Sequence, residues 1–160
     1  MDTRIGHPLP KRRPDDIEAT TNPLEMSAIE NYVAVKHGRA VYLALQAALG
    51  LAWWCTLELV APVRSWFELV PDRHQSLDAL FVADLVVFVG GSALSAWAVW
   101  IAADWATPVV AFTAGGTTYA TLYLAEWIVL TGVGSLGLAI MIMATAATGY
   151  IAVRTWQGTR

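Results

Sequence analysis

The chain has a single cysteine, Cys55, among its 160 residues. One cysteine cannot form an intrachain disulfide, a CxxC redox pair or a cluster of thiolate metal ligands. Because Cys55 lies in an apolar run, it is predicted to be a small buried hydrophobic residue and not a reactive thiol. A disulfide-stabilised scaffold is therefore excluded.

Charged residues are also scarce. They make up 14% of the chain, compared with about 25% in ordinary soluble domains. Residues 79–153 contain no Lys or Arg. Hydrophobic residues make up 56% of the whole chain and include eight tryptophans. A stretch this long without a cation cannot keep a globular surface in water, so lipid is the solvent for most of the chain. This composition excludes a disordered chain and a nucleic-acid-binding protein.

Histidines are few, and His7, His37 and His74 all lie outside the apolar runs described below. Their positions disfavour a bis-histidine haem or a histidine-ligated chlorin in the membrane. Three scattered histidines without a carboxylate cluster predict no metal site. We predict no obligate cofactor, although the aromatic content is compatible with a bound lipid, quinone or pigment.

Four apolar runs are long enough to cross about 30 Å of hydrocarbon at about 1.5 Å per residue. They cover residues 40–60, 78–104, 108–130 and 136–153. The fold class predicted from them is all-α, an integral membrane bundle of four transmembrane helices.

Capping residues mark the ends of these runs. Ser76 is a predicted N-cap of the second helix, and Thr107 followed by Pro108 is a predicted N-cap and first-turn proline of the third. The sequence Gly-Val-Gly-Ser at 132–135 predicts the end of the third helix and the cap of the fourth. Such short connections predict antiparallel hairpins.

The distribution of Lys and Arg predicts the orientation. The two chain ends carry most of these residues, namely Arg4, Lys11, Arg12, Arg13, Lys36 and Arg39 at one end and Arg154 and Arg160 at the other. The loop after the first span has only Arg64 and Arg73. We therefore predict cytoplasmic termini and a location in the cytoplasmic (inner) membrane.

The predicted organisation has three parts: a cytoplasmic tail over residues 1–39, the bundle over 40–156 and a short tail over 157–160. A short amphipathic helix is predicted from about residue 23, after the capping pattern at 22–25. It is either an interfacial helix or a cytoplasmic extension of the first span that is broken near Gly38. A second interfacial helix is predicted within residues 62–70, where aromatic and charged residues mix.

Polar and aromatic residues form one stripe on each of the first three predicted spans. The stripes consist of Tyr42, Gln46, Gly50 and Trp53; of Asp84, Phe88, Gly91 and Ser95; and of Tyr119, Tyr123 and Glu126, with Trp127 beside them. If the stripes face one another, they enclose a polar pocket that contains the carboxyl groups of Asp84 and Glu126. Without a nearby cation, both groups would favour the protonated form and could relay a proton. The alternative is structural, with a protonated carboxyl group that joins two helices by a hydrogen bond.

Three functions remain open. The first is a non-catalytic accessory or assembly subunit of a larger membrane complex, for which the small-residue run at 144–149 supplies a contact face. The second is a membrane-embedded enzyme that acts on an isoprenoid or sterol-like substrate, with Glu126 as proton donor or acceptor, Asp84 as its partner, and Tyr119 and Tyr123 as positioning groups. The third is a proton-coupled transporter. The predicted partners are membrane lipids and either other membrane subunits or further copies of the chain.

Overall fold

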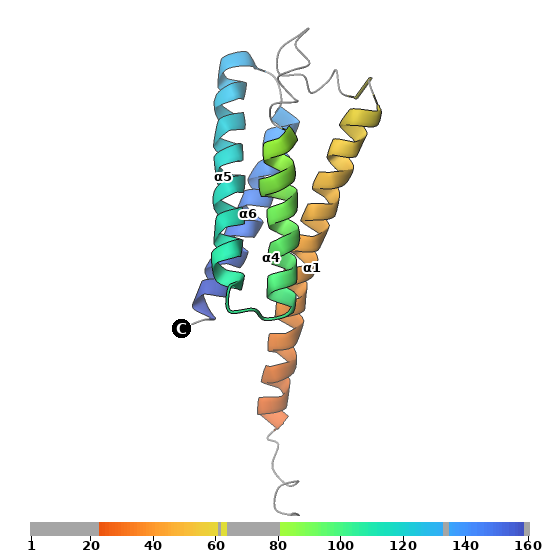
Figure 1. Cartoon of the computed structure of the whole chain (residues 1–160). Helices are drawn as coiled ribbons and strands as arrows, with labels where there is room; N and C mark the ends of the chain where they lie inside the picture. The colour runs from red at the N-terminus through yellow and green to blue at the C-terminus, as the bar shows by residue number, and fades with distance from the viewer. Residues whose placement is uncertain (1–22, 61, 64–80, 133–134, 159–160) are drawn as a thin grey trace, which may run out of the picture. The chain divides into compact units, whose positions relative to one another are not determined.

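The computed structural model describes residues 23–60, 62–63, 81–132 and 135–158. It divides the chain into two compact units, residues 1–34 and residues 35–160. The described residues are helical and contain no strand (Figure 1). The elements are α1 (Pro23–Leu59), the π-helix η2 (Asp84–Gly90), α4 (Gly91–Trp100), α5 (Ala106–Thr131) and α6 (Ser135–Gln157).

Helix α1 is one continuous element of 37 residues. The structure therefore has no separate short amphipathic helix at residue 23, and the predicted break near Gly38 is wrong. A single glycine costs a helix only about 1 kcal/mol, which is less than the loss of the backbone hydrogen bonds that a break would expose. The helical extension of the first span is the alternative that the structure supports.

Among the described residues, three segments are long and apolar enough to cross a membrane: Val33–Leu59, Phe81–Trp100 and Leu136–Gln157. They support the prediction of a helical membrane protein. The third predicted span, 108–130, folds as the 26-residue helix α5 but is not among the three. Threonines, glycines, tyrosines and Glu126 are spread along α5 and interrupt its apolar run.

The observed ends of α5 agree only in part with the predicted caps. Gly132 ends α5 in the left-handed conformation with φ of 74°, and its N–H donates to the carbonyl of Ile128, as a C-terminal glycine cap does. The predicted N-cap Thr107 is wrong, because α5 begins at Ala106 after Trp105 and has no side-chain cap. The predicted cap Ser76 and most of the predicted interfacial helix at 62–70 lie outside the described residues.

The second apolar segment is not a uniform α-helix. Residues Asp84–Gly90 form a π-helix, and Gly91 continues directly into α4. A π-helix has wider turns than an α-helix and inserts an extra residue into the helical register. Here the wide turns set the directions of Val87 and Phe88, which face glycines on other helices.

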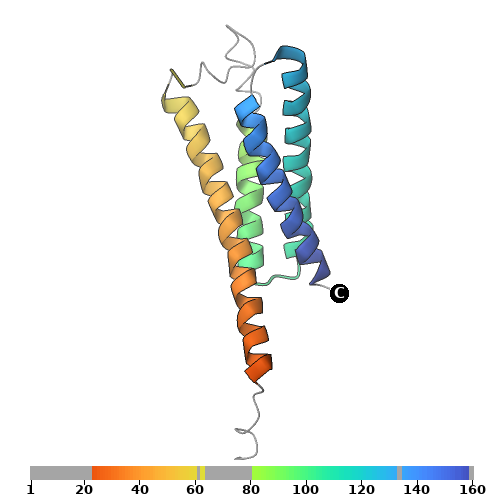
Figure 2. The ribbon, with the colours of Figure 1, turned by 180° about the vertical axis from the view of Figure 1, so that it is seen from behind.

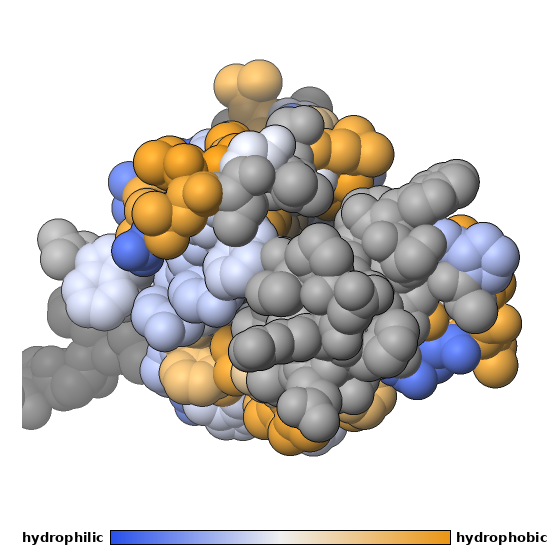
Figure 3. All heavy atoms as spheres, turned by 90° about the horizontal axis from the view of Figure 1, so that it is seen from above, coloured by the Kyte–Doolittle hydropathy of each residue, from blue (hydrophilic) through white to orange (hydrophobic). Residues whose placement is uncertain are grey.

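Within residues 35–160, the apolar core lies near the turn between α4 and α5, where the chain reverses (Figures 1 and 2). Its buried residues are Ala40, Leu43, Ala96, Ala98, Val99, Ala106, Val110 and Ile151. Large hydrophobic side chains also cover the outside of the helices, and the end-on view shows apolar groups around the periphery (Figure 3). Cys55 is exposed, so its predicted burial is wrong. An apolar exterior is expected where the surrounding medium is lipid.

Candidate functional site

Within residues 35–160, several polar side chains are buried between the helices. Gln46 of α1 is 6% exposed, and its side-chain amide reaches two other helices. Its Nε2 donates to Ser92 Oγ of α4 at 2.9 Å, and its Oε1 accepts from Thr148 Oγ1 of α6 at 3.0 Å. One side chain therefore links three helices.

Threonines extend this network across α5. Ser95 Oγ and Thr113 Oγ1 lie 3.0 Å apart between α4 and α5. Thr121 Oγ1 and Thr145 Oγ1 lie 2.7 Å apart between α5 and α6. We refer to these four residues together with Gln46, Ser92, Thr117 and Thr148 as the polar network.

Hydroxyl groups in the polar network also bond to their own helices. Thr113 Oγ1 donates to the Val109 carbonyl, and the single proton of the Thr148 hydroxyl is shared between the Ala144 carbonyl and Gln46 Oε1. Six members of the network are fully or almost fully buried, namely Gln46, Ser92, Ser95, Thr113, Thr117 and Thr148. A buried, hydrogen-bonded network of this kind holds helices together in a membrane. The polar network therefore stabilises the contacts between helices, and its polar atoms are hydrogen-bonded within the protein.

Two glycines bring the helices close enough for these bonds. A Cβ added to Gly91 would lie 2.9 Å from Thr113 Oγ1, and one added to Gly116 would collide with the Val87 side chain. Gly115, the neighbour of Gly116, has open space at the same position. The glycines at 91 and 116 therefore serve close packing between helices.

The structure buries only part of the predicted pocket. Gln46 and Ser95 are buried, and the ring of Phe88 packs against Gly50. Trp53 is 39% exposed, and Trp127 is half-buried. Of the predicted lining residues, Gln46 and Ser95 are the ones that join the polar network.

Asp84 begins the π-helix and is half-buried. Its carboxyl group is hydrogen-bonded by the side chain of Trp54 from α1. Trp54 is buried, and its ring meets the Phe81 ring edge-on with 5.1 Å between centroids. The uncharged indole N–H of Trp54 is therefore the hydrogen-bond donor to this carboxyl group.

Tyr119, Tyr123 and Glu126 lie on the outside of α5. Tyr119 is 74% exposed and Tyr123 is 41% exposed, and Glu126 is exposed as well. The structure therefore does not bring this stripe into the interior with Asp84. We call these three residues the outer stripe of α5.

The threonines were missed as a functional group by the sequence reasoning, although a signal was present. Thr113, Thr117 and Thr121 recur every four residues and so share one face of α5. Among the described residues, no three His, Cys, Asp or Glu side chains are grouped so that they could hold a metal ion.

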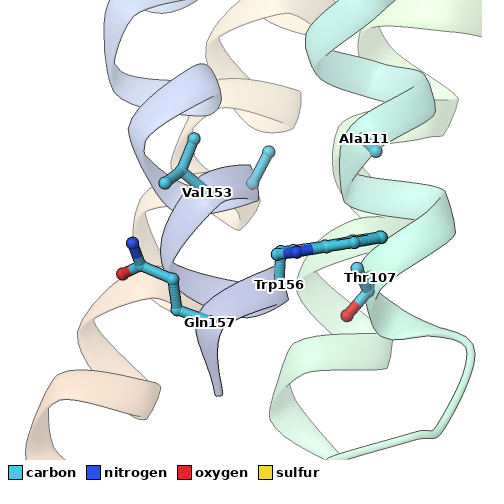
Figure 4. A pocket seen from close by; sticks show the side chains of 6 residues that line it. Thr107, Ala111, Val153, Trp156 and Gln157 are labelled. Atoms are coloured by element: carbon cyan, nitrogen blue, oxygen red, sulfur yellow. The ribbon is translucent and has the colours of Figure 1, made fainter. Parts of the chain in front are cut away.

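A groove of about 350 Å³ lies between the start of α5 and the end of α6 (Figure 4). Its lining residues are Thr107, Ala111, Ala152, Val153, Trp156 and Gln157. The Trp156 side chain extends from α6 toward α5 in this view. Thr107 Oγ1 is buried without a hydrogen-bond partner.

Tryptophans gather at the same end. Trp97, Trp100, Trp105 and Trp156 are each between 38% and 56% exposed. The Trp97 and Trp105 rings meet edge-on at 5.5 Å, and the Trp100 ring meets His37 of α1 at 4.6 Å. Exposed tryptophans grouped at one level are typical of the boundary between hydrocarbon and water.

Comparisons with protein-family models, with curated proteins and with solved structures found no match for this chain.

Proposed function

We propose that α5 is a fourth transmembrane helix and that both termini are cytoplasmic. Trp105 directly precedes α5 and Trp127 lies in its last two turns. They are separated by 22 residues, which corresponds to about 33 Å along a helix. This separation matches the distance between the two tryptophan-rich interfaces of a bilayer. Thr113, Thr117 and Thr121 of α5 are bonded inside the bundle, so these polar groups do not face lipid.

We further propose that the protein is a non-catalytic subunit of a larger complex in the cytoplasmic membrane. The observation that carries this proposal is the outer stripe of α5. Tyr119 is eight residues before Trp127, so its ring lies about 12 Å deeper than the interface. A polar group that faces lipid at this depth is costly, and a neighbouring protein helix would supply its hydrogen-bond partner.

The polar network supports the same reading. Its buried hydroxyl and amide groups are occupied by bonds between helices. The polar chemistry that remains accessible is on the outside, where another subunit would meet it. A subunit that presents a polar stripe to a partner helix needs no catalytic site of its own.

The test is site-specific photocrosslinking in native membranes. A photoreactive amino acid at Tyr119 is compared with one at Leu49 of α1, because their exposed fractions are similar, 74% and 69%. We expect a discrete protein adduct from position 119 and only lipid adducts from position 49. Gentle purification and native mass spectrometry should then identify the same partner at fixed stoichiometry. A chain that purifies as a monomer or a homo-oligomer, with lipid adducts from both positions, contradicts the subunit role.

One observation favours the enzyme alternative. Asp84 begins a π-helix, and its carboxyl group has the buried Trp54 as a neighbour. π-Helical segments often occur at functional sites. In this alternative, Asp84 acts on a lipid-soluble substrate without Glu126, which is exposed on α5. Asp84→Asn would then abolish turnover of the lipid that copurifies and leave the crosslink from position 119 unchanged.

A further inference from the structure

The groove between α5 and α6 differs from the rest of the apolar exterior because it has both an apolar wall and a polar rim. Ala111, Ala152 and Val153 give it an apolar wall, and Trp156 and Gln157 add polar atoms. An amphipathic ligand matches such a lining better than a purely hydrocarbon one.

A cation stands at the polar rim. Arg154 Nη1 donates to Gln157 Oε1 at 3.2 Å, and its guanidinium lies 6.0 Å from the centre of the Tyr150 ring. Arg154 is the only Lys or Arg in the sequences of α4, α5 and α6. Because Gln157 lines the groove, its bond to Arg154 keeps a positive charge next to the rim.

The groove also has tryptophans at its edge, which are typical of the headgroup level of a bilayer. Trp156 lines it, and Trp105 directly precedes α5. Tryptophan and arginine side chains at this level contact the glycerol and phosphate region of a bilayer. A partner that brings an anion, ester oxygens and a hydrocarbon chain in that order is a phospholipid.

We propose that this groove binds one anionic phospholipid. Its phosphate pairs with Arg154, its polar linkage region lies beside Trp156, and an acyl chain follows Ala111 and Val153. The inference requires that α5 and α6 lie in a membrane, and it is independent of the subunit role. The crosslinking partner of Tyr119 can therefore fail to appear while the lipid site stands.

The test uses the full chain in detergent. Phosphatidylglycerol and phosphatidylcholine with identical acyl chains are titrated separately, and bound lipid is counted by native mass spectrometry. We expect one phosphatidylglycerol to be retained at least tenfold more tightly than phosphatidylcholine. Arg154→Gln should remove this preference, and Arg154→Lys should restore most of it.

Filling the groove gives a second, independent arm. Ala111→Phe places a ring in the groove, and Ala48→Phe is the matched control because Ala48 is also exposed but lies on α1. We expect Ala111→Phe to weaken retention at least tenfold and Ala48→Phe to leave it unchanged. Equal retention of the two lipids by the unaltered protein, or retention unaffected by both Arg154→Gln and Ala111→Phe, overturns the proposal.

Discussion

Gln46 shows how a single polar side chain can organise a membrane protein. Its amide bonds to Ser92 and Thr148 on two other helices. A side-chain hydrogen bond between membrane helices contributes about 0.6 kcal/mol on average and up to about 1.7 kcal/mol. Because Gln46 makes two such bonds, it stabilises the packing of α1 against α4 and α6.

We therefore expect Gln46→Met, which keeps the length of the side chain, to lower the free energy of unfolding by about 1–3 kcal/mol. Unfolding in mixed micelles, followed by circular dichroism, measures the change. Leu45→Met is the control, because Leu45 is 57% exposed and should tolerate the change. Equal losses in both variants would mean that Gln46 contributes only bulk.

Gly115 and Gly116 are adjacent in sequence but differ in their surroundings. A Cβ on Gly116 would collide with Val87 of η2, whereas one on Gly115 would meet open space. Gly116→Ala should therefore destabilise the protein by about 1–3 kcal/mol. Gly115→Ala should be neutral or stabilising, because alanine has the higher helix propensity. Thermal unfolding of both variants in the same detergent decides the matter, and a loss in Gly115→Ala alone would refute the packing argument.

At the scale of the element, the wide turn of η2 is open to a deletion test. A π-helix contains one residue more than the α-helical path it replaces. Deleting Val86, which is 64% exposed, should let Asp84–Gly90 close into an α-helix with the flanking register kept. The melting temperature should then fall by only a few degrees.

The comparison is deletion of Leu94, which is 43% exposed and lies within the regular helix α4. Removing one residue there rotates the remainder of the helix by about 100°, so Ser95 would turn away from Thr113. We expect loss of a monodisperse peak in size-exclusion chromatography for this variant only. If both deletions behave alike, the wide turn does not absorb the missing residue.

The two polar faces of α5 illustrate how far an element can be predicted. The spacing of Tyr119, Tyr123 and Glu126 correctly indicates one stripe, and the spacing of Thr113, Thr117 and Thr121 indicates another. Thr117 and Tyr119 are two residues apart, which places them about 200° apart on the helix. Periodicity identifies both faces but does not say which one is inside.

At the scale of the whole molecule, the proposed topology makes a clear prediction. Single cysteines are placed in a Cys55→Ser background at Leu59, the end of α1, and at Gly158, after the end of α6. With four spans and cytoplasmic termini, a membrane-impermeant maleimide should label position 59 in intact cells and position 158 only after permeabilisation. Labelling of both positions in intact cells would mean that the number of crossings between them is even, which excludes three.

The amino-acid sequence was sufficient to predict a helical protein with membrane-spanning character and the end of α5 at Gly132. The scarcity of cations across residues 79–153 requires a lipid environment, and Gly132 ends α5 because glycine adopts the left-handed conformation without a steric penalty. These are local properties, set by each segment and its solvent.

Which polar residues are buried became clear only from the packing of the helices. Threonine is small and can bond to the carbonyl of its own helix, so Thr113 and Thr117 fit between closely packed helices. Tyrosine is too large for that space, and Tyr119 faces outward. The choice depends on close approach at Gly91 and Gly116, where a different helix supplies the neighbouring atoms. Such contacts join residues far apart in sequence, and no pattern within one helix contains them.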